Sequence, residues 1–275
     1  MLSMTTDYAT STGCPEPALR GIAEAGFTHV HWCHQWNTDF IYHECEIDQI
    51  ARWMKQSGLG LTDLHASSGN EKCWTSPREH ERRAGVELVR NRIEMCAALG
   101  GNVIIMHTGS EPEDDAGKTL FWSQLHKSLD VLEPSARERG VRIAIENGNF
   151  GLIEKLLQKY GPDFLGLCYD SGHGNLHPNG LDRLEGLKDR LISTHLHDND
   201  GASDQHKLLF TGTVGWPRLA RVIAESSYEK WVSLETTMRN CGIDDETEFL
   251  AQAFDGATRF AHMLDDARVS KGETA

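Results

Sequence analysis

The 275-residue chain has no paired cysteine motif, no long apolar run and no excess of basic residues. Its seven cysteines are an odd number and are scattered without a C-x-x-C pair, which is typical of reduced cytoplasmic thiols rather than of a disulfide framework. No apolar stretch approaches the roughly 18 residues of a membrane span, and no charged-then-apolar leader is visible. We therefore expect a cytoplasmic protein that is neither secreted nor embedded in a membrane.

Positive charge is also scarce, because 27 Lys and Arg stand against 41 Asp and Glu, for a net charge of −14. This balance disfavours nucleic acid and anionic membranes as partners, since both are negatively charged and bind clusters of Lys and Arg. One segment of the sequence is rich in arginine, but glutamates alternate with these arginines. This pattern predicts a salt-bridged helix face. The residues concerned are Arg78, Arg82, Arg83, Arg90 and Arg92 with Glu79, Glu81, Glu87 and Glu94.

No internal repeat, low-complexity segment or linker interrupts the chain, so residues 1–275 are predicted to form a single domain. Short apolar runs alternate with helical periodicity about eight times, which at this length indicates an α/β protein with a closed (β/α)8 TIM barrel. The expected strands cover residues 2–9, 27–32, 59–65, 102–107, 141–146, 164–170, 192–195 and 231–235. The expected helices cover residues 15–25, 47–56, 76–99, 121–139, 152–160, 181–187, 217–226 and 249–264. The third is predicted to begin with Ser76 as its cap and Pro77 as its first helical residue.

The stretch from Ile192 to His206, ISTHLHDNDGASDQH, opens apolar and becomes dense in imidazole and carboxylate. This profile suits a buried strand that delivers its carboxyl end into a loop of metal ligands. The lack of cysteine within it favours a divalent cation over a thiolate site. A solvated acidic loop with incidental histidines is the alternative.

Other predicted strands end in the same way. Six of them terminate in a residue that can bind a metal or transfer a proton, and none terminates in Lys or Arg: the residues are His65, His107, Glu146, Asp170, His195 and Glu235. In a (β/α)8 barrel the carboxyl ends of the strands form one rim, which carries the active site. The sequence therefore predicts a candidate site at that rim.

The motifs around these residues resemble one superfamily. They read H-A-S at His65, M-H-T-G at His107, I-E-N at Glu146, D-S-G-H from Asp170 to His173, H-L-H-D-N-D-G from His195, D-Q-H from Asp204 to His206 and S-L-E-T at Glu235. In this order they are similar to the xylose-isomerase-like barrels. That superfamily includes sugar and sugar phosphate isomerases and epimerases, inosose dehydratases and the apurinic endonuclease IV group.

The resemblance implies a shared metal site made of Glu146, Asp170, His195 and Glu235. Three carboxylates and one imidazole suit one divalent ion, Mn²⁺, Mg²⁺ or Co²⁺, and tolerate Zn²⁺. His195 fits the register of the family ligand, which is separated by two residues from an Asp, here Asp198. A register that begins at His197 and ends at Asp200 stays open. Glu146 and Glu235 are the implied proton-transferring residues. The remaining matched residues are expected to bind substrate: His65, His107, His173, Asp204 and His206.

The chain also departs from the family pattern. Relatives often carry L-P-L-G-E-G where this chain reads Lys207-Leu-Leu-Phe-Thr-Gly, so that Phe210 and Thr211 replace Gly and Glu. The second strand region contains His31 and His34, either of which could contact substrate. Trp32, Trp36 and Trp74 lie on or after strand ends and could stack on a sugar ring, although core packing is the more usual role of tryptophan.

The resulting prediction is a metal-dependent isomerase or epimerase of a sugar, sugar phosphate or polyol. A small-molecule substrate is its expected partner, without nucleic acid or membrane, and a homo-oligomer is compatible with such a barrel. A zinc-dependent phosphodiesterase of the endonuclease IV type and an inosose-type dehydratase are the enzymatic alternatives. A non-catalytic sugar-binding barrel is the third class, which the intact pair Glu146 and Glu235 disfavours.

Overall fold

Eight parallel strands form the barrel in a computed structural model that describes residues 1–69, 71–230 and 232–272. Their hydrogen-bonded order is β7-β6-β5-β4-β3-β2-β1-β8, as the alternation of strands and helices predicts. The strands are β1 (Leu2–Thr5), β2 (His29–Trp32), β3 (Gly60–His65), β4 (Val103–Met106), β5 (Arg142–Glu146), β6 (Leu165–Asp170), β7 (Leu191–His195) and β8 (Val232–Leu234).

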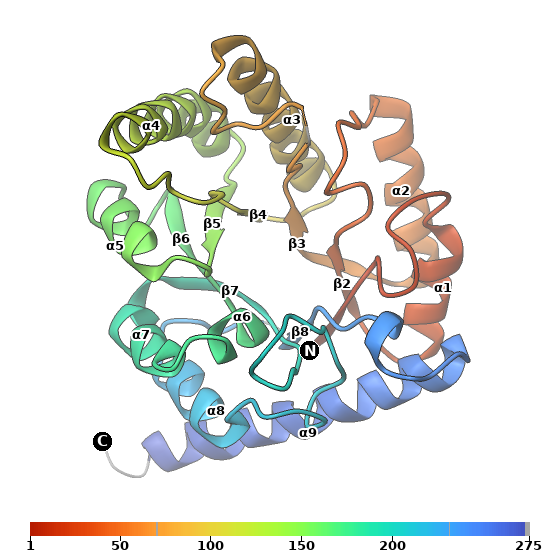
Figure 1. The fold of residues 1–275 in the computed structure, drawn as a ribbon. Helices are drawn as coiled ribbons and strands as arrows, with labels where there is room; N and C mark the ends of the chain where they lie inside the picture. The colour runs from red at the N-terminus through yellow and green to blue at the C-terminus, as the bar shows by residue number, and fades with distance from the viewer. Residues whose placement is uncertain (70, 231, 273–275) are drawn as a thin grey trace.

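Helices follow the strands and form an outer ring around them (Figure 1). These are α1 (Glu16–Glu24), α2 (Glu44–Ser57), α3 (Glu79–Ala98), α4 (Asp115–Glu138), α5 (Phe150–Lys159), α7 (Gly180–Leu187), α8 (Trp216–Glu225) and α9 (Glu246–Gly272). The short helix α6 (Ser171–Asn175) lies inside this ring, and two 3₁₀ turns, η1 (Lys188–Arg190) and η2 (Met238–Asn240), complete the described elements.

The seam between β7 and β8 is closed by a short bridge rather than by a full ladder. The Leu196 amide donates to the Ser233 carbonyl at 2.9 Å, and the Glu235 amide donates to the Leu196 carbonyl at 3.0 Å. These two bonds fix the residue that follows β7 beside the residue that follows β8. The closure therefore brings His195 and Glu235 to the same place at the rim.

The apolar core is divided between the outside and the inside of the barrel. The larger part packs the strands against the ring of helices and includes fully buried Leu64, Ile104 and Leu167. A smaller cluster fills the barrel interior: Val103, Ile105, Ala144, Cys168 and Ile192. Burial of this kind stabilises the fold by roughly 25 cal/mol for each Å² of apolar surface removed from water.

Local chemistry explains several helix ends. Asp114 and Asn149 cap α4 and α5, accepting from the amides of Gly117 at 2.8 Å and of Leu152 at 3.1 Å. Gly58, predicted to end a helix, adopts φ = 69° after α2, a conformation that glycine reaches without steric cost.

Some predicted boundaries were wrong. The third helix does not begin at Ser76 and Pro77, because α3 starts at Glu79 with Arg78 in the cap position. Ser76 instead accepts from the Arg78 amide and donates to Glu81, which places it in the preceding turn. The helix α6 was missed, and Trp231, placed in the last predicted strand, lies outside the described residues.

The salt-bridged helix face is confirmed by three pairs on or beside α3. Arg78 contacts Glu81, Arg82 contacts Glu79 and Arg90 contacts Glu87. Arg92 differs, because its fully buried guanidinium donates to the carbonyl of Phe40 at 3.0 Å and lies 4.5 Å from the centre of the Tyr42 ring.

All seven cysteines are free. Among the described helices, none combines the length and the apolar character that a membrane crossing requires.

Candidate functional site

Glu146 lies at the centre of the predicted rim. Its carboxylate oxygens are within 3.6 Å of four imidazoles, which come from the ends of three other strands and from α6: the distances are 3.3 Å to His107, 3.6 Å to His65, 3.4 Å to His173 and 3.3 Å to His195. The carboxylate is almost fully buried. The structure therefore brings these predicted site residues together at the carboxyl end of the barrel.

One side of Glu146 forms a first group of donor atoms. His65 Nε2 and His107 Nε2 are 3.1 Å apart, and both face Glu146 Oε2. His65 Nδ1 is engaged by the carbonyl of Ala66 at 3.0 Å, which fixes its ring and leaves Nε2 directed toward His107. Two imidazole nitrogens and one carboxylate oxygen at this spacing match the donor set of a small divalent ion.

The other oxygen of Glu146 belongs to a second, deeper group. His195 Nδ1 lies 3.3 Å from Glu146 Oε1 and 3.2 Å from Glu235 Oε2, so the two predicted catalytic carboxylates flank one imidazole. Asp170 borders this group, with Oδ1 at 2.9 Å from His197 Nε2 and 3.9 Å from His173 Nδ1.

A third group lies nearer the surface. Asp204 Oδ2 is 3.3 Å from His173 Nε2 and 3.1 Å from His206 Nε2. His206 is further held through Nδ1, 2.7 Å from the carbonyl of Glu235. The loop that carries His206 is constrained, since His206 itself has φ = 50°.

Several buried polar atoms of the whole site have no hydrogen-bond partner within the described part of the chain: Glu146 Oε2, Asp170 Oδ2, His173 Nδ1, and both ring nitrogens of His195 and of His197. Orphaned buried polar atoms destabilise a fold, by about 1–3 kcal/mol each. Their concentration at one place, with nitrogen and oxygen donors only, fits a divalent cation held by the predicted residues.

Electrostatics in the deeper group favour ionised carboxylates. Burial by itself raises the pKa of Glu146, but His107 and His195 outweigh it and hold that pKa well below its ordinary value. Burial likewise raises the pKa of Glu235, and His195 and His31 bring it well below the ordinary value. Carboxylates in this state can ligate a cation or accept a proton.

The outer group behaves as a partly exposed ion cluster. Burial lowers the pKa of His173, yet Asp170 and Asp204 raise it to about 11. Burial lowers the pKa of His206, and Asp204 with Glu235 raises it to about 10. The pKa of Asp204 falls because its two histidine neighbours outweigh its burial.

His195 and His197 lie on different sides of the site. His195 contacts both glutamates, whereas His197 contacts Asp170 and stacks on His206 with ring centres 4.0 Å apart. Both rings are fully buried. The assignment of His195 as the metal ligand stays a prediction, and its contacts with Glu146 and Glu235 support it.

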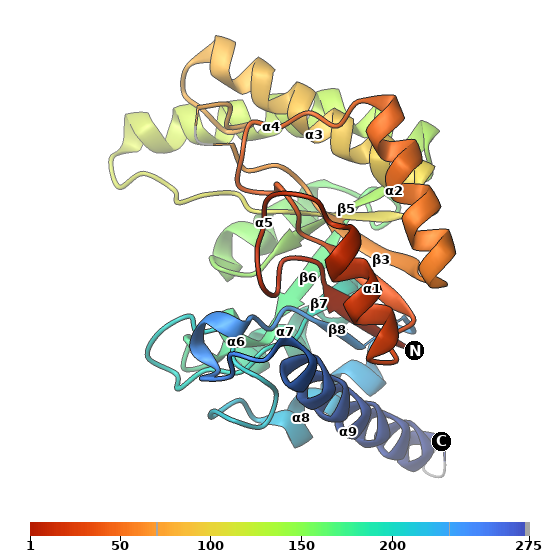
Figure 2. The same cartoon turned by 90° about the vertical axis from the view of Figure 1, so that its right-hand side faces the viewer.

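A cavity of about 720 Å³ opens beside the outer group. Trp36, Asp204, His206 and Glu235 line it, together with residues 7–11 after β1 and residues 237–240, 243 and 244 after β8. Trp36 also covers His65, with ring centres 4.5 Å apart, and follows Gln35 at φ = 60°. In Figure 2, α6 lies on the left, and the N-terminus, where β1 begins, lies on the right.

The other two tryptophans have packing roles. Trp32 is fully buried and donates to the Tyr42 hydroxyl at 3.3 Å. Trp74 is buried and donates to the carbonyl of His107 at 3.1 Å, which braces that strand end. His34 is turned toward the carbonyl of Gly13 at 2.8 Å, so its ring supports a loop.

Sequence reasoning missed Asp63 and Ser193 and left the role of His31 open. All three are buried in the barrel interior, where His31 Nδ1 lies 2.5 Å from Asp63 Oδ1. The available signal was a carboxylate in the middle of an apolar strand, since a buried charge requires a partner.

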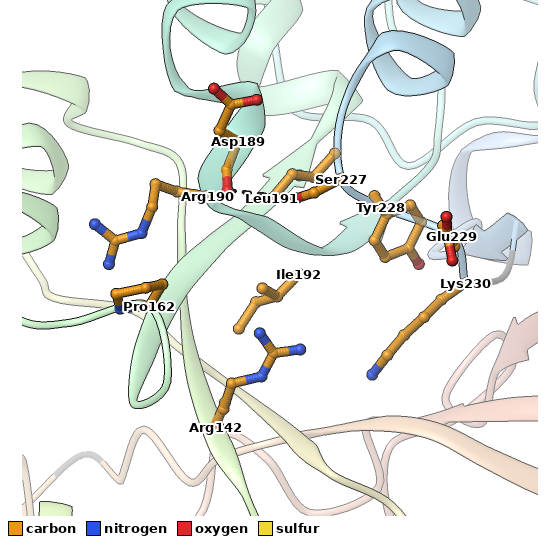
Figure 3. Close-up of a pocket in the computed structure, with 10 residues that line it drawn as sticks. All are labelled: Arg142, Pro162, Asp189, Arg190, Leu191, Ile192, Ser227, Tyr228, Glu229 and Lys230. Atoms are coloured by element: carbon orange, nitrogen blue, oxygen red, sulfur yellow. Dashed lines mark hydrogen bonds between the residues drawn. The ribbon is translucent and has the colours of Figure 1, made fainter.

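A second cavity, of about 290 Å³, lies at the opposite end of the barrel (Figure 3). Residues at the beginnings of β5 and β7 and just before β8 line it, among them Arg142, Arg190 and Lys230. None of the predicted site residues lines this cavity. The candidate site is therefore confined to the carboxyl ends of the strands.

Comparison with known proteins agrees with the fold. An uncharacterised protein, y4fM, of Sinorhizobium fredii is 33% identical over 90% of this chain and 88% of its own length. A probable endonuclease 4 of Thermotoga sp. is 25% identical over 79% of this chain and 84% of its own length.

Among solved structures, an L-ribulose 3-epimerase superposes with a TM-score of 0.80 at 14% identity, covering 100% of this chain and 97% of that one. At this level of identity the likeness concerns the fold. The family described as xylose isomerase-like TIM barrel matches residues 19–253, and the chain belongs to that family.

Proposed function

We propose that this protein is a metal-dependent isomerase or epimerase that moves a proton next to the carbonyl of a sugar. The observation that carries the proposal is the placement of Glu146 and Glu235 on either side of His195 Nδ1, at 3.3 and 3.2 Å. Two ionised carboxylates that converge on one point, at the rim of a barrel, suit proton removal and proton return on a substrate bound between them.

The residues that would hold the metal are Glu146, Asp170, His195 and Glu235. The first three carry unpartnered polar atoms, which fit a divalent ion such as Mn²⁺, Co²⁺, Mg²⁺ or Zn²⁺. Such an ion supplies Lewis acidity toward a carbonyl when it is bound. One glutamate removes the proton from the carbon beside the carbonyl, and the other returns it. Burial of both carboxylates limits the access of water to the transferred proton.

The neighbouring residues are suited to orienting hydroxyl groups. His65, His107 and His173 surround Glu146, and Asp204 with His206 lines the open cavity. Imidazole and carboxylate can donate to and accept from a polyol. Trp36 adds a flat apolar surface beside these polar groups, which suits the face of a sugar ring.

The charge of the cavity favours an unphosphorylated substrate. Four carboxylates, those of Asp7, Asp204, Glu235 and Asp244, line it. Two cationic groups oppose them, the guanidinium of Arg239 and the imidazole of His206, whose pKa is raised to about 10. A phosphate group would meet repulsion at most of this surface. A neutral ketose or related polyol is therefore the substrate class that we infer.

The direct test is hydrogen exchange. D-Fructose, D-tagatose and L-ribulose are incubated separately in deuterated buffer with protein loaded with Mn²⁺ or Co²⁺, and NMR follows the hydrogens beside the carbonyl. We expect deuterium to enter at one such carbon of at least one sugar, together with an isomerised or epimerised product. Loss of water from a polyol without such a product would support the dehydratase instead.

A second candidate is a zinc-dependent phosphodiesterase of the endonuclease IV type. The observation that favours it is the presence of three adjacent donor groups, of which Glu146 joins two, because phosphodiester cleavage is often assisted by several metals. The acidic cavity argues against a DNA substrate.

This candidate is tested with a labelled duplex that contains an abasic site and with zinc-loaded protein. We expect no incision. Multiple-turnover cleavage that disappears in Glu146→Gln would replace the sugar proposal with the phosphodiesterase.

A further inference from the structure

A chain of buried polar residues runs through the barrel interior and ends at Glu235. Ser193 Oγ donates to Asp63 Oδ2, and Asp63 Oδ1 lies 2.5 Å from His31 Nδ1. His31 Nε2 lies 2.8 Å from Cys33 Sγ, and the Cys33 thiol donates to Glu235 Oε1 over 3.6 Å. The first four side chains are at most 1% exposed, so the chain is closed to solvent below the rim.

The chemistry of the donors gives this chain a direction. Asp63 accepts from Ser193 and from the Nδ1–H of His31, so the imidazole is fixed with Nε2 facing Cys33. The thiol carries one hydrogen, and among the described residues Glu235 is the one carboxylate within its reach. With that hydrogen directed at Glu235, the donor in the contact with Cys33 Sγ is the Nε2–H of His31. Each member thus restricts the orientation of the next, up to the glutamate.

The same atoms can be considered as a metal site, since His31, Cys33 and Glu235 place a nitrogen, a sulfur and an oxygen close together. Zinc binds nitrogen at about 2.0 Å and sulfur at about 2.3 Å, so two such ligands in a tetrahedron lie about 3.5 Å apart. His31 Nε2 and Cys33 Sγ are 2.8 Å apart. That spacing is a direct contact, short even for a hydrogen bond between nitrogen and sulfur, and it is too short for two ligands of one ion.

The two oxygens of Glu235 consequently have different surroundings. Oε1 faces the Cys33 thiol and, at 3.6 Å, His31 Nε2, whereas Oε2 faces His195 Nδ1 at 3.2 Å. The His31 ring also packs against the His195 ring, with centres 4.1 Å apart. The interior chain therefore anchors one oxygen of Glu235 and leaves the other directed at the candidate site.

We propose that Asp63, His31 and Cys33 are positioning residues that orient the Glu235 carboxylate for proton transfer. The proposal rests on the proposed function, in which Glu235 is one of the two proton-transferring groups. It assigns a role to the unusual second strand, whose histidine and cysteine point into the barrel instead of toward substrate. Outer-shell partners of this kind typically change metal affinity or activity by about 10- to 100-fold when removed.

The test compares Cys33→Ala, Cys33→Ser and Asp63→Asn with the native chain. The matched control is Cys96→Ala, which removes another fully buried thiol. Cys96 belongs to helix α3, outside the barrel, and its thiol donates to the carbonyl of Val103. Circular dichroism establishes that each variant is folded. The two readouts are the affinity and visible spectrum of bound Co²⁺, and the separate values of kcat and KM for the sugar that shows exchange.

We expect Cys33→Ala and Asp63→Asn to bind Co²⁺ with an altered spectrum and an affinity about tenfold lower, and to lose at least about tenfold in kcat with little change in KM. Cys33→Ser, which keeps a donor, should recover most of both losses, and Cys96→Ala should behave as the native chain. Folded variants with native Co²⁺ binding and native kcat would overturn the proposal while leaving the proposed function intact. A native chain that neither binds Co²⁺ nor exchanges any sugar would overturn both.

Discussion

The two ends of the barrel carry opposite chemistry on the same set of strands. At the carboxyl end, histidines and carboxylates converge on Glu146 and Glu235. At the other end, the cavity in Figure 3 is lined by Arg142, Arg190 and Lys230. Both ends contain half-buried or buried charge, so charge alone does not mark the functional end.

The difference lies in how the polar atoms are satisfied. The Arg190 guanidinium donates to three backbone carbonyls, those of Leu157, Tyr160 and Leu165, at 2.5, 2.9 and 2.7 Å. It thereby joins the start of β7 to the end of α5 and the start of β6, which is a structural role. Within the part of the chain that the structure describes, Arg190 leaves only its Nε buried without a partner, whereas at the carboxyl end several such nitrogen and oxygen atoms, including those of His195 and Asp170, lie together. Atoms that a fold leaves unsatisfied at one place indicate binding, because their burial costs stability.

If the carboxyl end is the functional end, removing its two central carboxylates in turn has the largest effect on activity. Glu146→Gln and Glu235→Gln keep the shape of the side chain but cannot accept a proton in the same way. We expect each to lower the rate of solvent deuterium exchange by about 10²–10⁴-fold, the range that general acid–base catalysis contributes. Wild-type exchange in either folded variant would remove that residue from the mechanism.

The number of metal ions bound per chain is a second test of the site at the carboxyl end. We predict one tightly bound divalent ion per chain, because the proposed ligands Glu146, Asp170, His195 and Glu235 would supply a single hard donor set. Chelation should abolish exchange, and Mn²⁺ or Co²⁺ should restore it. Elemental analysis of protein purified without added metal is the measurement. Near three zinc ions per chain would contradict the prediction and favour the phosphodiesterase, since the groups at His65 and at Asp204 would then also be occupied.

The rim could be predicted from sequence because its residues terminate recognisable apolar runs. Glu146, Asp170 and His195 each follow continuous buried strands, and parallel strands end at one edge. The interior could not be predicted in this way. Asp63 lies inside β3, and its partners His31 and Ser193 come from β2 and β7, so their contact depends on the closure and stagger of the barrel.

Loop conformation was equally inaccessible to sequence reasoning. Phe210, which replaces a glycine of the family pattern, has φ = 67°, a conformation in which glycine is normally favoured. Its ring packs on Trp216 and under the guanidinium of Arg259, with centres 5.3 Å and 3.8 Å away. This packing accounts for a bulky residue at a strained position, and it involves α9, about 50 residues later in the chain.

A smaller effect is expected from pH on the metal-free protein. The pKa values of His173 and His206 are raised to about 11 and about 10 by carboxylates that include Asp204. Groups whose pKa is raised on folding contribute stability that is fully present below the unfolded value of about 6.5 and is lost as pH rises through the folded value. Chelated protein should therefore have a Tm that falls between neutral pH and about pH 10–11.

Differential scanning calorimetry of chelated protein measures this fall, with His206→Gln as the comparison. That variant should start less stable and show a shallower decline, because one of the two raised groups is gone. Parallel declines in both proteins would place the pH dependence elsewhere in the molecule.

The smallest effect is expected at the opposite end of the barrel, from Arg142→Gln. No hydrogen bond or ion pair links the Arg142 guanidinium to the residues that the structure describes, and its charge adds to burial in lowering the pKa of Lys230. Removal of one of two neighbouring cations relieves their repulsion, so stability should stay the same or rise by less than about 1 kcal/mol. Exchange activity should equal that of the native chain, because Arg142 begins β5 whereas Glu146 ends it. Thermal unfolding and the deuterium assay on the same preparation measure both quantities. A folded Arg142→Gln protein with strongly reduced exchange would show that the two ends are coupled through the strand, and the division of the barrel into a structural and a functional end would fail.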